Sequence, residues 1–130
     1  ARRNAEHHRV ADRITFLQSD LLSSVVRRPS SVNLLCANLP YIASDELRDL
    51  PVAWHEPALA LDGGPDGLSL IRRLLADAPR VMAPHGGLLL EIGATQGKRA
   101  IALARKEFPE TQVTLHQDLA GLDRVVAIRL

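Results

Sequence analysis

The sequence predicts an α/β protein with a mostly parallel sheet and helices on both faces. Short apolar runs alternate along the chain with segments whose apolar residues recur at helical spacing. Such alternation is typical of parallel sheets covered by helices. Of the 130 residues, 46% are hydrophobic, which is enough to bury the core of one domain. Residues 1–130 are therefore expected to lie within a single domain.

The first third of the chain is expected to hold the end of a helix and two strands. Residues 1–10 have helical character, and residues 14–17 are predicted to form a short strand. A second strand, buried on both faces, is predicted for residues 32–37, a short apolar run that follows Pro29-Ser30-Ser31. Residues 44–57 form a long polar connection, and connections of that length are often functional.

The remaining two thirds alternate helix and strand. Apolar residues recur at helical spacing over residues 68–78 until Pro79 interrupts the pattern. The other expected elements follow in order: a turn at 84–87, a strand at 88–92, a helix at 96–108 that stops before Pro109, and strands at 112–116 and 125–130.

Composition argues against several classes of partner. The net charge of +1 gives no attraction to nucleic acid or membrane, and 3% aromatic residues are too few for base-stacking platforms. The single cysteine, Cys36, is predicted to lie in a core strand, excludes an internal disulfide and favours a reducing, cytoplasmic location. The five histidines lack metal-ligand spacing, so no metal site is expected.

The most informative segment is Asn38-Leu39-Pro40-Tyr41, directly after the predicted strand at 32–37. Ligands of open α/β sheets bind beyond the carboxyl ends of such strands. Asn38 offers a side-chain carbonyl oxygen, Leu39 a backbone carbonyl and Tyr41 a flat aromatic face. Two acceptors and a stacked ring can hold a planar NH2 group, which indicates chemistry on a nitrogen. The alternatives are a turn-capping role for Asn38 and a packing role for Tyr41.

The tetrapeptide resembles the Asn-Pro-Pro-Tyr signature of amino-group methyltransferases that use S-adenosylmethionine. In order along the chain, other segments are similar to the protein-(glutamine) methyltransferases that modify peptide chain release factors: Phe16-Leu17-Gln18-Ser19-Asp20-Leu21, His55-Glu56-Pro57-Ala58-Leu59-Ala60-Leu61, Gly63-Gly64-Pro65-Asp66-Gly67-Leu68, Glu91-Ile92-Gly93 with Gln96, and Asp118-Leu119-Ala120-Gly121 with Asp123-Arg124-Val125-Val126. The resemblance spans nearly all 130 residues.

The resemblance implies a partial Rossmann-like methyltransferase fold, in which residues 1–130 are the C-terminal portion of one catalytic domain. The first strands and the glycine-rich cofactor loop of that domain are expected to be missing. The cluster at 63–67 does not follow a predicted strand and is not expected to replace that loop. The implied reaction transfers methyl from S-adenosylmethionine to a glutamine amide nitrogen of a release factor. The isolated chain is expected to be a poor enzyme and to self-associate through an exposed sheet edge at 32–37.

The resemblance also implies a role for each of six residues. Asn38 and Tyr41 are expected to be catalytic, and Asn38-Leu39-Pro40-Tyr41 to bind the glutamine side chain. Asp20 and Leu21, together with Asn38, are expected to bind the cofactor, although Asp20 could instead cap a helix. Leu39 stands where the family has proline; its carbonyl can still accept a hydrogen bond, but its φ is not locked.

Two alternative functions remain open from the sequence. A DNA amino-methyltransferase would use the same four-residue pocket on the adenine or cytosine of a flipped nucleotide. A folded remnant, or a module that only binds a partner, would need no pocket chemistry. Trp54 and Glu56 in the long connection suit substrate contact or packing equally, and Glu91 has no readable role.

Overall fold

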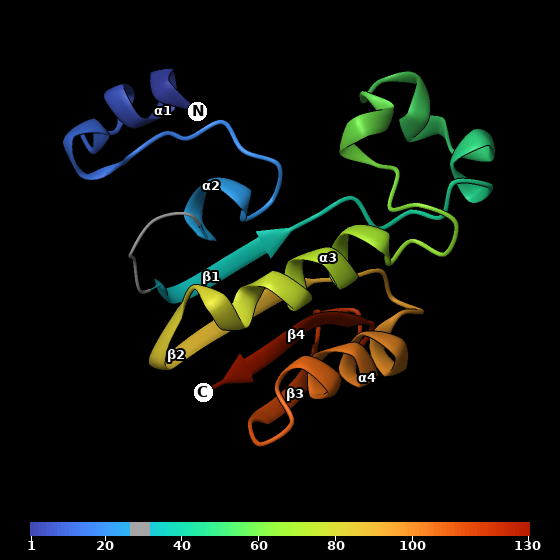
Figure 1. Ribbon diagram of the computed structural model, residues 1–130. Coiled ribbons are helices and arrows are strands. Elements are labelled where there is room, and N and C mark those ends of the chain that lie inside the picture. The colour runs from blue at the N-terminus through green and yellow to red at the C-terminus, as the bar shows by residue number, and fades with distance from the viewer. Residues whose placement is uncertain (27–31) are drawn as a thin grey trace.

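The computed structural model describes residues 1–26 and 32–130, so Pro29-Ser30-Ser31 lie outside the described residues. Four α-helices, four strands and five short 3₁₀ helices make up its regular structure (Figure 1). The helices are α1 (Arg2–His7), α2 (Ser23–Val26), α3 (Ser69–Asp77) and α4 (Gly97–Glu107), and the strands are β1 (Val32–Asn38), β2 (Met82–Glu91), β3 (Gln112–Gln117) and β4 (Asp123–Arg129).

The strands form one sheet in the order β1-β2-β4-β3. β1 pairs with β2 in parallel, whereas β4 is antiparallel to both β2 and β3. Three of the four strands therefore run in the same direction, with β4 reversed between its neighbours. β4 is reversed because it follows β3 through a short turn at 118–122, and short turns join antiparallel strands. The predicted α/β class is confirmed.

Both α3 and α4 pack on the same face of the sheet (Figure 1). Leu88 and Leu90 of β2 are fully buried beneath them, while Leu89 between these two is 41% exposed. Successive side chains of a strand point to opposite faces, so Leu89 marks the other face of the sheet. That face also bears Leu34, 58% exposed. The expected cover on both faces is thus not observed among the described residues.

Two predicted strands need correction. The strand expected at 14–17 is absent, and Ile14 and Leu17 are largely exposed. Strands are stable only beside a hydrogen-bonded neighbour, and this segment has none among the described residues. β1 is an edge strand and is not buried on both faces, so Cys36 is exposed rather than in the core.

The turn expected at 84–87 lies inside β2. Pairing between β1 and β2 shifts register there, from Val32 opposite Met82 to Leu34 opposite Gly87. His85 adopts a positive φ of 60° within this irregularity. Pro-His-Gly-Gly thus bends a continuous strand instead of ending it, as bulges do.

The helices predicted from apolar spacing are confirmed. α3 and α4 begin and end within a residue or two of the predicted limits, and Leu68, Ile71 and Leu75 are buried as their spacing indicates. The connection at 44–57 contains only short 3₁₀ turns. Within the described residues, no helix has the length and apolar character needed to cross a membrane, and no cluster of three or more metal-binding side chains occurs.

Candidate functional site

The tetrapeptide lies at the carboxyl end of β1. Asn38 is the last residue of the strand and pairs in register with Glu91 at the end of β2. Asn38, Leu39, Pro40 and Tyr41 all line one cavity of about 190 Å³, which Ile42, Ala60 and Leu61 complete. The structure therefore brings together the four residues predicted to bind the substrate amide.

Hydrogen bonds join the chain after Tyr41 to the segment before α3. The Ile42 N–H donates to the Leu61 carbonyl at 3.1 Å, and the Gly63 N–H donates to the Ile42 carbonyl at 2.8 Å. The Ser44 hydroxyl donates to Asp62 Oδ1 at 2.7 Å. This bond, with a second from a backbone N–H of the same segment, holds the pKa of Asp62 below its usual value. These bonds therefore hold the two ends of the loop between Ser44 and Leu61 together, next to the tetrapeptide.

The glycine cluster at 63–67 packs directly on the backbone of the tetrapeptide. A Cβ on Gly63 would lie 2.8 Å from the Pro40 carbonyl oxygen. A Cβ on Gly67 would collide with the Tyr41 carbonyl oxygen, and Gly67 also has a φ of +71°. Glycine is the residue that suits both a close backbone approach and a positive φ. The cluster therefore acts as a close-fitting support for Pro40 and Tyr41.

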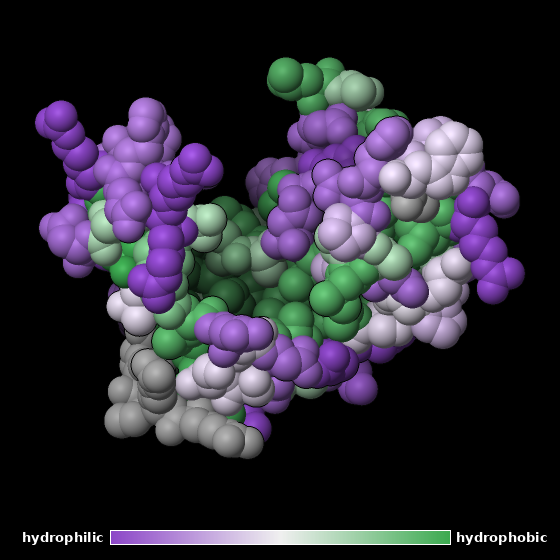
Figure 2. All heavy atoms as spheres, turned by 90° about the horizontal axis from the view of Figure 1, so that it is seen from above, coloured by the Kyte–Doolittle hydropathy of each residue, from purple (hydrophilic) through white to green (hydrophobic). Residues whose placement is uncertain are grey.

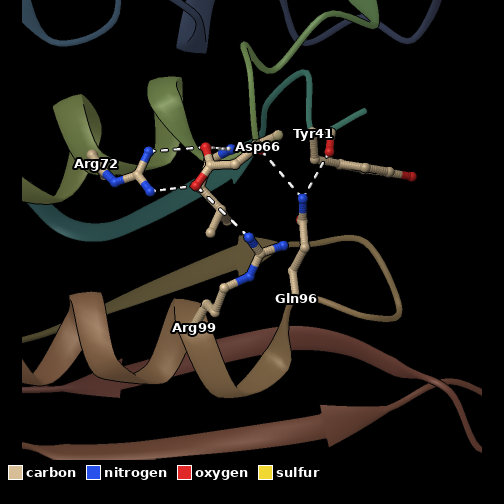
Figure 3. Close-up of polar contacts among 7 residues, drawn as sticks. Tyr41, Asp66, Arg72, Gln96 and Arg99 are labelled. Carbon is tan, nitrogen blue, oxygen red and sulfur yellow. Dashed lines mark hydrogen bonds and ion pairs between the residues drawn. The ribbon is translucent and has the colours of Figure 1, made fainter. Parts of the chain in front are cut away.

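Asp66 joins this support to both helices (Figure 3). Its carboxylate accepts two hydrogen bonds from Arg72 of α3, at 3.0 and 2.5 Å, and lies 3.7 Å from the guanidinium of Arg99 on α4. The Arg72 bonds, followed by the backbone N–H of Leu68 and the charge of Arg99, lower the pKa of Asp66 to about 2. The loop is thus anchored by a carboxylate that stays ionised at neutral pH.

Gln96, directly before α4, joins the support to the end of β2. It is the buried polar residue of the described core, at 5% exposure. Its side-chain NH2 donates to the carbonyls of Tyr41 at 2.8 Å and Gly67 at 3.3 Å, and its Oε1 accepts from the Gly93 N–H at 2.9 Å. The sequence indicated Gln96 only as part of a similar segment, with no role, because burial of a polar residue at a helix start cannot be read from periodicity.

A larger cavity of about 680 Å³ lies next to the tetrapeptide. Asp20 and Leu21 line it together with Leu39 and Pro40. Asn38, the third residue predicted to bind the cofactor, lines only the smaller cavity. Seen from above, a hollow with apolar walls separates the N-terminal segment from the rest of the molecule (Figure 2). The volume is in the range of small-molecule sites.

Asp20 does not cap the short helix α2. The hydroxyl of Ser19 accepts from the Ser24 N–H at 3.0 Å, whereas the Asp20 carboxylate accepts from Arg73 of α3 at 2.5 Å. Asp20 and Arg73 are both more than half exposed. The carboxylate thus reaches the cavity rim, where a polar group of a ligand could approach it.

Trp54, Glu91 and Arg124, also considered from the sequence, line neither of the two cavities. Trp54 is 79% exposed, so it does not pack in the core. Arg124 donates to Asp118 and to the Ile92 carbonyl, at 3.1 and 3.3 Å. Asp118 chiefly raises the pKa of Arg124, and the charges of Tyr41 and Glu91 add to this effect. Glu91 therefore has a basic group nearby, although no contact assigns it a role.

The fold and the site define an α/β protein with a cavity of about 190 Å³ at a strand end and a larger cavity beside it. No family model matches the chain. It is 42% identical over 132 residues to a release factor glutamine methyltransferase of Cereibacter sphaeroides, covering 100% of this chain and 46% of that protein. The corresponding protein of Moorella thermoacetica is 42% identical over 125 residues, covering 95% of this chain and 44% of that protein.

The resemblance noted from the sequence is confirmed: nearly the whole chain is similar to release factor glutamine methyltransferases. The chain spans a little under half the length of these curated relatives, from 42% to 46%. A solved protein-(glutamine-N5) methyltransferase, release factor-specific, from Alicyclobacillus acidocaldarius aligns with 88% of this chain and 98% of its own, at TM-score 0.46 and 21% identity.

Proposed function

We propose that this chain provides the amide-binding part of an enzyme that methylates a glutamine side chain of a peptide chain release factor. The observation that carries the proposal is the pair of adjoining cavities. Asn38 and Tyr41 line the smaller cavity, Asp20 and Leu21 line the larger, and Leu39 and Pro40 line both. A methyl donor in the larger cavity would therefore lie next to an acceptor in the smaller.

The smaller cavity suits a primary amide. Asn38 Oδ1 and the Leu39 carbonyl each accept one of the two N–H hydrogens, and the Tyr41 ring covers the plane of the group. An amide nitrogen is a poor nucleophile because its lone pair is delocalised into the carbonyl. Fixing its orientation lowers the barrier, by as much as about 7–11 kcal/mol in the best intramolecular cases.

The same acceptors favour the transition state over the substrate. As the new N–C bond forms and the sulfur–methyl bond of the donor breaks to leave a thioether, the nitrogen gains positive charge and its hydrogens bind more strongly to Asn38 and Leu39. The nitrogen then loses one hydrogen as a proton to give the neutral N-methyl amide. S-adenosylmethionine, when bound, supplies the electrophilic methyl group. Asp20 and Leu21 would hold it at the rim of the larger cavity, whose apolar wall includes Leu59 and Leu70.

The test is a chimera in which this chain replaces the matching segment of the Moorella thermoacetica relative. The chimera and the relative are incubated with S-adenosylmethionine and a release factor, and the glutamine-containing peptide is analysed by mass spectrometry. We expect one added methyl group on the glutamine with both proteins. A release factor with that glutamine replaced by alanine is the control and gains no methyl.

A chimera that folds and binds the cofactor but leaves the release factor unmodified would overturn the proposal. Duplex DNA is offered in a parallel reaction. Methylation of adenine or cytosine there, without modification of the release factor, would favour the alternative that the sequence left open.

A further inference from the structure

We infer that Gln96 is a positioning residue for the proposed reaction: its side-chain amide holds the backbone of Tyr41 in the conformation that the acceptor site requires. The inference rests on the proposed function. Gln96 lines neither of the two adjoining cavities but a third one of about 430 Å³, which Tyr41 and Asp66 also line. Toward an amide in the smaller cavity it therefore acts through the segments that it binds.

One buried amide bonds to three segments, two of which are distant from Gln96 in the sequence. The NH2 group reaches the carbonyl of Tyr41, 55 residues away, and that of Gly67, 29 residues away. The Oε1 atom accepts from the Gly93 N–H, just beyond β2. Gln96 therefore joins the chain after β1, the glycine cluster before α3, the end of β2 and the start of α4.

The contact acts on the tyrosine backbone rather than on its ring. In Figure 3 the Tyr41 carbonyl faces Gln96, while the ring extends away from it. Holding this carbonyl sets the peptide plane that follows Tyr41 and hence the direction in which the ring leaves the chain. The Leu39 carbonyl and the Asn38 side chain lie just before Tyr41 in the chain, so their placement depends on the same anchor.

Two glycines pack closely on the Gln96 amide. A Cβ on Gly67 would lie 2.5 Å from the Gln96 NH2 nitrogen, and a Cβ on Gly93 would lie 3.2 Å from Oε1. The glycines thus allow the backbone to close around this amide. A glutamine suits the position because it donates and accepts at once, as two carbonyls and one N–H require.

Two substitutions separate donation from shape. Gln96→Glu keeps the length of the side chain but places a carboxylate oxygen against the carbonyls of Tyr41 and Gly67. Gln96→Met keeps the volume and leaves both carbonyls and the Gly93 N–H without the side-chain partner that they have in the parent. Val113→Ala, in the core at β3 and away from the site, is the control for a general loss of stability.

The variants are made in the chimera described above, and kcat and KM are measured below the unfolding temperature of each. We expect both Gln96 variants to lower kcat by at least about tenfold, since small misplacements of reacting groups have large effects. The KM for S-adenosylmethionine should stay unchanged. Val113→Ala should lower the unfolding temperature but not kcat.

A second readout does not depend on activity. Hydrogen exchange of the backbone amides at 41–43, which include the Ile42 N–H bonded to the Leu61 carbonyl, should accelerate in both Gln96 variants but match the parent in Val113→Ala. If kcat and the exchange at 41–43 both match the parent in the Gln96 variants, the inference is wrong. If the parent chimera itself fails to methylate while exchange responds as expected, the proposed function fails and the structural role of Gln96 stands.

Discussion

Asn38 ends β1 exposed to the smaller cavity, with Glu91 beside it in the sheet. In the proposed reaction, the Asn38 side chain supplies one acceptor oxygen for an amide hydrogen, which becomes more acidic as the nitrogen gains positive charge. Preorganised acceptors of this kind contribute most when the surrounding segments cannot move away. Just beyond the tetrapeptide, the backbone hydrogen bonds of Ile42 with Leu61 and Gly63 restrict such movement.

In the chimera, Asn38→Ala should lower the rate of methyl transfer by at least about 100-fold, comparable to the loss of one oxyanion donor. The substitution removes an acceptor that both orients the amide and stabilises its developing charge. Binding of S-adenosylmethionine, measured by calorimetry, should change much less. Asn33→Ala, on the same strand but outside the cavity, is the matched control. Near-normal transfer by Asn38→Ala would remove Asn38 from the proposed mechanism.

Tyr41→Ala should reduce the rate of transfer more than Leu39→Pro. The first substitution deletes the ring that covers the amide plane. The second introduces the proline that the Asn-Pro-Pro-Tyr signature has at this position, and it keeps the backbone carbonyl. Steady-state rates and circular dichroism of both variants provide the comparison. If Leu39→Pro prevents folding, the backbone at 38–41 differs in shape from that signature, and the proposed site is incorrect.

At the scale of elements, the site is a junction of loops held by polar side chains from two helices. Asp66 binds Arg72 of α3 and lies near Arg99 of α4, while Gln96 precedes α4. The two helices contact each other on one face of the sheet. The glycine cluster and the tetrapeptide are therefore fixed relative to the core through charge pairs as well as backbone bonds.

Ionisation of Asp66 should make stability depend on acid pH. Its pKa of about 2 in the folded chain lies below its usual value, so the stabilisation is present at neutral pH and is lost as pH falls from about 4 to about 2. Asp66→Asn lacks this dependence. Thermal unfolding should show a gap between parent and variant that is constant above pH 5 and closes below pH 4. A gap that stays constant down to pH 2 would contradict the assigned pairing with Arg72.

For the whole molecule, the described sheet leaves one face open and has two edge strands, β1 and β3. β1 has a single neighbour, and Leu34 and Leu89 are exposed on the face away from α3 and α4. Unpaired backbone groups on an apolar edge strand favour pairing with another strand. The pairing of the N-terminal segment with the rest of the molecule involves an exposed ion pair, Asp20 with Arg73, which contributes little to stability.

We expect the 130-residue chain by itself to self-associate through β1. Light scattering over a range of concentrations should show species larger than the monomer. Leu34→Lys should shift the distribution toward monomer, because a charge on an edge strand opposes pairing. Leu119→Lys, on the exposed hairpin tip, is the control and should have no such effect. A strictly monomeric parent chain would show that this edge is not adhesive.

The sequence by itself determined the α/β class, the limits of α3 and α4 and the tetrapeptide at a strand end. These features are local, because apolar periodicity, a proline after a helix and a short apolar run all act within one turn or strand. The notion of an amide-binding site also came from side chains that are adjacent in the sequence, Asn38 to Tyr41.

Only the tertiary structure decided which strand face stays open, that Pro84-His85-Gly86-Gly87 bends β2 instead of ending it, and that residues 14–17 form no strand. It also decided that Gln96 meets Tyr41 and that Asp20 meets Arg73, pairs 55 and 53 residues apart. Burial on one face depends on what packs against it, and strand formation depends on a neighbour. Contacts between residues so far apart depend on how the chain folds back, which no local pattern encodes.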